Sequence, residues 1–217
     1  MGQVIERIFI SKDWITIIIL MIITLLIFNK IRHPLKFNKL QTLLYSSGYI
    51  GSYSKSIPLI LSVFNIIFIF IFIIVISLLI FIATSLYGFN NNNDVIFFFK
   101  IFIFALSYIL VRFIIGFLLS ILFEKEKEQQ YFTFLKLSYL SSFSILILPL
   151  LIVNFYINST IYSHLVIILA CLLLIYFFVL QIKNNHNLVF SNIFYFILYL
   201  CALEIAPYMI VYKLLIV

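Results

Sequence analysis

Long apolar runs set the first limit on what this chain can fold into. A helix needs about 20 predominantly apolar residues to cross the hydrocarbon core of a bilayer. Of the 217 residues, 65% are apolar and 10% are charged, whereas soluble domains are about half apolar and about a quarter charged. We therefore expect an all-α, polytopic transmembrane helix bundle with about six spanning helices, over residues 14–31, 57–86, 95–123, 137–156, 164–182 and 192–215.

These six runs take up most of the chain, so residues 1–217 are expected to form a single transmembrane domain. The net charge of +7 comes from basic residues in short loops between the runs. That distribution is typical of membrane topology and argues against nucleic acid as a partner. The expected partner is the lipid bilayer. Cys171 and Cys201 both fall inside apolar runs, which argues against a disulfide framework or a cysteine metal cluster.

Lys and Arg are distributed unevenly between the two sides of the predicted bundle. The positive-inside rule assigns the more basic side to the cytoplasm, so both termini are expected outside the cytoplasm. One side holds three such residues, Arg7, Lys12 and Lys213, and the other holds nine, Lys30, Arg32, Lys36, Lys39, Lys55, Lys125, Lys127, Lys136 and Lys183.

The longest connection between runs covers residues 32–56. It contains four basic residues, Arg32, Lys36, Lys39 and Lys55, together with Pro34 and a stretch rich in Ser, Gly and Tyr. We predict that this connection is a docking loop for a partner.

Two charged residues of opposite sign lie deep within the runs. Glu204 is the deep member of the seven acidic residues, and Arg112 is the deep cation. Arg112 precedes Phe123 by 11 positions and Glu204 follows Asn192 by 12, so both are expected at nearly the same height. Isolated charges at that depth cost several kcal/mol. The sequence therefore predicts an intramembrane ion pair between Arg112 and Glu204.

A polar stripe is expected beside this pair on both helices. Pro207 also removes the normal partner of the Leu203 carbonyl and predicts a kink beside Glu204. The stripe consists of Tyr108, Gly116 and Ser120 on the third run, at four-residue steps from Arg112, and of Cys201, Pro207 and Tyr208 on the sixth.

The ion pair has two interpretations. It is a structural clasp between helices, or it is a proton or ion relay whose acid is Glu204. Polar residues such as Ser141, Ser144 and Asn154 could line a route. They serve equally well as hydrogen-bonding groups between helices.

Catalytic signatures are absent from the sequence. It contains no Gly-x-Ser-x-Gly elbow, no His-Glu-x-x-His zinc helix and no Gly-x-x-x-x-Gly-Lys phosphate loop. His33, His164 and His186 lie in or beside loops without a second ligand at i+3 or i+4. The sequence thus predicts no enzyme, no cofactor and no metal.

The C-terminal run carries a family resemblance. Residues 194–207, which read FYFILYLCALEIAP, and the following Tyr212-Lys213-Leu214 resemble an uncharacterised domain-of-unknown-function family (4271) of multi-pass membrane proteins from Bacteroidota. The resemblance extends to Asp13-Trp14, Arg112, Gly116, Phe123, Tyr131, 136–139 and Pro149. It implies a multi-pass protein of the bacterial cytoplasmic (inner) membrane with unassigned activity, and it supplies no catalytic residue.

These observations favour a non-enzymatic scaffold or assembly component of the cell envelope, with a membrane or envelope protein as partner. The alternative is a small transporter or proton or ion pathway that uses Glu204 with Arg112 as its counter-charge. A membrane enzyme acting on lipid-linked substrates has no residue in its support.

Overall fold

The computed structural model describes residues 13–44, 49–50, 62–88, 95–122, 124, 126–157 and 159–184. Every element in this part of the chain is helical. The elements are α1 (Asp13–Arg32), α2 (Pro34–Gln41), the short 3-10 helix η1 (Thr42–Leu44), α4 (Val63–Leu86), α5 (Val95–Leu122), α6 (Glu126–Ile157) and α7 (Thr160–Asn184).

Five of these helices, α1, α4, α5, α6 and α7, are long and apolar enough to cross a membrane. They lie over the first five expected ranges, and the sixth range, 192–215, lies outside the described residues. A chain in hydrocarbon must pair its backbone groups within its own segment, and a helix does so. The chain is therefore all-helical where the structure describes it, with helices suited to a membrane.

The start of α6 differs from the expected start at residue 137. The helix begins at Glu126, because Glu124 adopts a left-handed conformation with φ 52° and turns the chain between α5 and α6. The Glu124 amide donates to the Ile121 carbonyl at 3.2 Å in this turn. Consequently Glu126 and Lys127 belong to a polar first turn of α6 that extends beyond its apolar portion.

Local signals define the ends of α4. The Ser62 hydroxyl caps its first turn by accepting from the Asn65 amide at 3.4 Å. At the other end Gly88 has φ 73°, a conformation that glycine adopts without steric cost and that commonly follows a helix. Both boundaries thus follow from residue types in the sequence.

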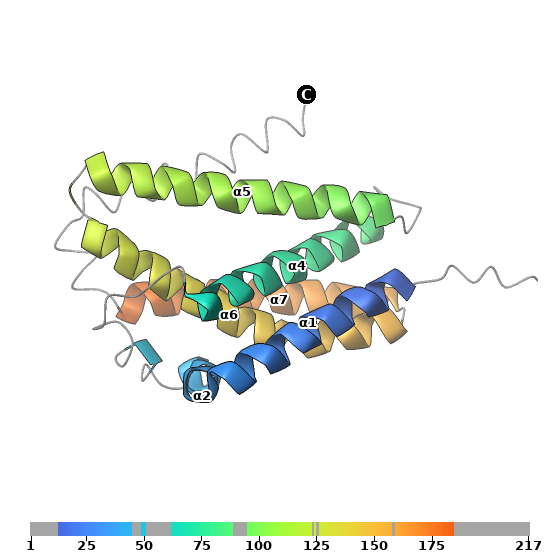
Figure 1. Cartoon of the computed structure of the whole chain (residues 1–217). Coiled ribbons are helices and arrows are strands. Elements are labelled where there is room, and N and C mark those ends of the chain that lie inside the picture. The colour runs from blue at the N-terminus through green and yellow to red at the C-terminus, as the bar shows by residue number, and fades with distance from the viewer. Residues whose placement is uncertain are drawn as a thin grey trace, which may run out of the picture.

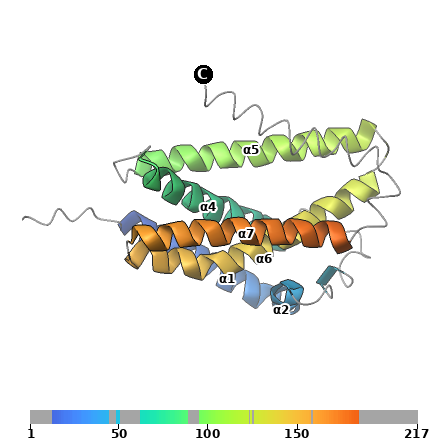
Figure 2. The same ribbon diagram turned by 180° about the vertical axis from the view of Figure 1, so that it is seen from behind.

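The arrangement places α4 at the centre of the bundle. α4 contacts α1, α5, α6 and α7, while α5 lies along one side of the bundle (Figure 1). The view from behind shows α7 beside α6, with α5 again along the outside (Figure 2). In both views the ends of α5 and α7 and the start of α6 lie at the same end, which we call the basic end because α2 with Lys36 and Lys39 is also there.

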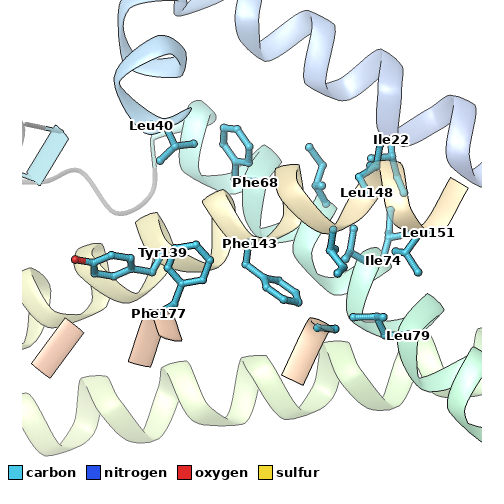
Figure 3. Packing of buried hydrophobic residues seen from close by; sticks show 14 of the residues in the cluster. Ile22, Leu40, Phe68, Ile74, Leu79, Tyr139, Phe143, Leu148, Leu151 and Phe177 are labelled. Carbon is cyan, nitrogen blue, oxygen red and sulfur yellow. The ribbon is translucent and has the colours of Figure 1, made fainter. Parts of the chain in front are cut away.

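The core lies mainly between α4 and α6, and Figure 3 shows its large side chains meeting there. Phe68 and Ile74 of α4 face Phe143 and Leu151 of α6, and each is almost fully buried. Lipid is as apolar as these side chains, so close van der Waals packing is what stabilises their contact.

Candidate functional site

The connection after α1 folds into a short helix rather than an open loop. Pro34 occupies the first turn of α2, where its missing N–H costs nothing, and its ring disfavours a helical conformation at His33. His33 accordingly has φ −136° and breaks the path from α1 to α2. In the sequence, Pro34 and the three-residue spacing of Phe37 and Leu40 indicate this helix. The prediction of a loop over residues 32–56 did not take them into account.

Apolar and polar contacts hold α2 against the bundle. Leu40 is fully buried, and the Phe37 ring stacks on the Phe68 ring of α4 with centroids 6.1 Å apart. At the end of α1, the buried Asn29 amide Nδ2 donates to the Phe64 carbonyl of α4 at 3.2 Å. Further along, Tyr49 stacks on Phe134 of α6 at 5.8 Å. The connection is therefore anchored at several points.

The basic side chains of the predicted docking loop lie on this anchored segment. Arg32 and Lys39 are exposed and Lys36 is partly exposed, whereas Lys55 lies outside the described residues. The pKa of His33 is lowered, chiefly by burial and further by the nearby charges of Lys36 and Arg32. This part of the surface is positively charged and favours an anionic group.

A groove of about 650 Å³ lies between α4, α5, α6 and α7. Aromatic and aliphatic side chains line most of it, including Phe72 and Ile76 of α4 and Phe177 of α7. Polar side chains gather toward the basic end, where the wall contains Arg112, Ser120, Glu126, Gln129, Gln130, Thr133, Lys136 and Gln181. The groove thus combines an apolar body with one polar end that carries charged side chains of both signs.

Three residues of the predicted stripe, Tyr108, Arg112 and Ser120, lie in the wall of this groove. Gly116 is buried on the same helix. The remaining predicted site residues, Cys201, Glu204, Pro207 and Tyr208, lie outside the described residues. The pair of Arg112 with Glu204 accordingly stays a prediction.

Polar groups along α6 form hydrogen bonds within the bundle. The Ser141 and Ser144 hydroxyls donate to carbonyls one turn earlier in their own helix, at 2.6 and 2.9 Å. Asn154 instead joins two helices, since its side-chain oxygen accepts from the Ser163 hydroxyl of α7 at 2.9 Å. The Asn154 contact agrees with the interpretation of these residues as hydrogen-bonding groups between helices, whereas the printed bonds of Ser141 and Ser144 stay within α6.

Among the residues described, no group of three or more His, Cys, Asp or Glu side chains comes together as a metal centre would require.

The chain matches a known protein family over most of its length. A family model described as Domain of unknown function (DUF4271) matches residues 15–215. The chain belongs to the DUF4271 family. The resemblance found in the sequence is therefore confirmed for the family.

The DUF4271 match spans α4, α5, α6, α7 and all of α1 except its first two residues, and it also covers residues 185–215, which lie outside the described part of the chain. No curated protein and no solved structure matches the chain. The DUF4271 description assigns no activity.

Proposed function

We propose that this DUF4271 protein is a non-enzymatic scaffold or assembly component of the bacterial cell envelope, inserted in the cytoplasmic (inner) membrane. Its docking surface is the exposed side of α2 with the preceding Arg32. The partner is a membrane or envelope protein that presents acidic side chains to this surface. The observation that carries the proposal is the anchoring of α2 by Phe37 and Leu40, which leaves Lys39 exposed.

Anchoring favours docking for an energetic reason. A surface that is already ordered loses little conformational entropy when a partner binds, so more of the contact energy appears as affinity. Arg32 and Lys39 contribute positive charge on this anchored segment, which selects an acidic partner and accelerates its encounter.

The proposed topology has six spanning helices, with both termini outside the cytoplasm. It is supported by the gathering of Arg32, Lys36, Lys39, Lys127 and Lys183 at one end of the described bundle. Cytoplasmic loops carry such an excess of Lys and Arg. The basic end is then the cytoplasmic end, and the partner docks from that side. The proposed bacterial origin and the cytoplasmic (inner) membrane are those of the Bacteroidota proteins that the sequence resembles.

A charge reversal on α2 tests the docking surface. The full chain carrying Lys39→Glu is crosslinked in its native membrane, purified in gentle detergent and compared with wild type for a stoichiometric partner. We expect recovery of that partner to fall by roughly ten-fold, equivalent to ~1.4 kcal/mol of binding. Lys183→Glu is the matched control, because it makes the same charge change at the same end on α7.

Two results contradict the proposal. One is recovery of the chain without any stoichiometric partner, together with full activity in liposomes. The other is an equal loss of partner in Lys39→Glu and Lys183→Glu, which would indicate a general effect of charge and no docking at α2.

The alternative, a small transporter or proton or ion pathway, is favoured by a different observation. Arg112 lies in the wall of the groove together with Gln129, Thr133 and Lys136, so polar groups line one end of a space inside the bundle. In this proposal Glu204 carries the proton or ion and Arg112 is its counter-charge. Reconstituted vesicles should then show flux that Glu204→Gln abolishes, and equal flux in the two proteins removes this function.

A further inference from the structure

The chain turns a corner between α1 and α2, at residues 28–35. We propose that this corner binds an anionic phospholipid, with the lipid phosphate against the Arg32 guanidinium and the acyl chains against Ile31 and Leu35. This inference goes beyond the proposed docking function and does not depend on it. It concerns a lipid beside the corner, whereas docking concerns a protein partner and is tested at Lys39.

The helix α2 runs across the direction of the long helices. Both views show the long helices from the side and α2 nearly end-on, at the edge of the bundle (Figures 1 and 2). Its eight residues extend over about 12 Å, far less than the hydrocarbon core, and it follows α1, which is long enough to cross a membrane. A short helix in this position lies along the membrane surface, at the depth of the lipid headgroups.

The side of the corner that faces away from the bundle is apolar on both helices. Ile31, in the last turn of α1, is 76% exposed, and Leu35, in the first turn of α2, is 74% exposed. Phe37 and Leu40 are buried against the bundle, so the anchoring of α2 leaves Leu35 on the outside. Acyl chains stabilise such side chains at the end of a span, because the contact removes them from water.

A cation lies between these two apolar residues in the sequence. Arg32 is exposed, and its guanidinium carbon lies 5.9 Å from the centre of the Phe28 ring, a cation–π contact that holds it beside the end of α1. A guanidinium is planar and carries several N–H donors, so it can bind two oxygens of a phosphate at once. A positive charge beside exposed apolar side chains matches the two parts of a phospholipid, its phosphate and its acyl chains.

A second basic group adds to the positive charge of the corner. Lys36 and Arg32 both lower the pKa of His33, so both cations lie close to its ring. Lys and Arg side chains near a membrane surface attract anionic lipids, and the attraction increases with their number. The corner therefore favours a phospholipid with a net negative charge over a zwitterionic one.

The acidic side chains that the structure describes lie elsewhere. Asp13 begins α1 and is about 28 Å from Arg32 along the helix. Glu124 and Glu126 lie just before α6 and at its first residue, and both views show the start of α6 near the end of α5 and away from α2 (Figures 1 and 2). Among the described side chains, a phosphate at Arg32 therefore meets cations rather than carboxylates.

Lipid binding to the purified full-length chain tests the site. The chain in gentle detergent is titrated with phosphatidylglycerol, and bound lipid is measured by native mass spectrometry. We expect Arg32→Gln to weaken phosphatidylglycerol binding by at least about five-fold, because the phosphate loses a charged donor with two prongs. Lys183→Gln is the matched control and should change binding little, since it removes one exposed cation at the same end of the bundle, in the last turn of α7.

A second variant tests the apolar part of the site and leaves the charge unchanged. Leu35→Gln should weaken binding by about three-fold, because the acyl chains lose an apolar contact. Ile161→Gln is its control, because Ile161 is 79% exposed and lies near the start of α7, at the opposite end of the bundle. All four substituted side chains are exposed, so the variants are expected to fold, and a monodisperse elution peak checks this.

Several results overturn the proposal. One is equal phosphatidylglycerol binding by wild type and Arg32→Gln, and another is an equal loss in either variant and its control. Phosphatidylcholine that binds as tightly removes the selection for an anionic lipid, and displacement of the lipid by inorganic phosphate assigns Arg32 to a free anion. A dimer in the same spectra that Leu35→Gln dissociates assigns the corner to a second copy. The titration uses the chain without any partner protein, so failure here is distinct from failure of docking at Lys39.

Discussion

The helices α4 and α5 follow one another in the chain and are both strongly apolar, yet they occupy opposite positions in the bundle. The most apolar 18-residue stretch of each helix has a mean hydropathy of 3.6 in α4 and 2.5 in α5. In α4, 56% of that stretch is buried, against 17% in α5. Lipid and protein are equally good solvents for an apolar side chain. Apolarity therefore places a helix in the membrane without deciding whether it becomes the centre or the edge.

The two helices also differ in their polar residues. α4 buries Ser77, whose hydroxyl donates to the Ile73 carbonyl of its own helix at 2.7 Å. α5 places Arg112 and Ser120 on the groove side, while Leu110, Val111 and Ile114 are exposed. A peripheral helix with polar residues on one side has a defined inward face, and the deep charge of α5 lies on that side.

The largest effect is expected at the inward face of α5. Arg112→Gln should lower the free energy of unfolding by ~3 kcal/mol, because the predicted pair with Glu204 would lose its cation. The yield of monodisperse full-length protein after gentle solubilisation measures this loss, with Lys100→Gln, an exposed cation nearer the start of α5, as the control. Exchanging the two charges, Arg112→Glu with Glu204→Arg, should restore part of the yield. Normal yield from Arg112→Gln would show that α5 needs no clasp.

The same substitution in α4 and α5 tests their positions directly. Leu78 of α4 is 1% exposed and Leu118 of α5 is 54% exposed. Leu78→Ala should cost ~2 kcal/mol, the low end of the usual range, because lipid solvates the side chain when the helices separate. Leu118→Ala should cost less than about 0.5 kcal/mol. Thermal unfolding in detergent measures both, and equal costs would contradict the central position of α4.

A smaller effect is expected where α1 is joined to α4. Asn29→Ala removes the hydrogen bond to the Phe64 carbonyl and should cost ~1 kcal/mol, since bonds between membrane helices are worth about that much. Asn38→Ala, on the exposed side of α2, is the control. Protease sensitivity of the segment around α2 would report the loss, and unchanged sensitivity in Asn29→Ala would show that Phe37 and Leu40 alone anchor it.

The smallest effect is expected in the pH dependence of stability, through His33, which also contacts α4. The His33 ring lies edge-on to the Phe64 ring, with centroids 5.7 Å apart, and its pKa is lowered by burial and by Lys36 and Arg32. A lowered pKa means that the folded state resists protonation. Stability is therefore full above the ordinary histidine pKa and falls slightly as pH decreases through that range. His33→Gln should flatten this portion of the pH profile, and an unchanged profile would assign it to another group.

Sequence patterns anticipated part of the site and missed another part. The four-residue steps from Tyr108 to Ser120 predicted one polar side of α5, and Tyr108, Arg112 and Ser120 do line the groove. The helix α2 was not anticipated, because eight residues with three apolar side chains, Leu35, Phe37 and Leu40, give too weak a periodicity to separate a helix from a loop. Its form depends on Phe68 of α4, a residue about thirty positions away that supplies the surface for Phe37.

By itself, the sequence determined that this protein is helical and suited to a membrane, and it marked Arg112 as a deep charge. Both conclusions follow from local properties, namely apolar length and the cost of exposing backbone or charge to hydrocarbon. Only the tertiary structure decided that α4 is central, that Asn29 binds the Phe64 carbonyl and that α2 is anchored. These depend on side-chain fit between distant segments, and shape complementarity leaves no periodic trace in a chain that is apolar on nearly every side.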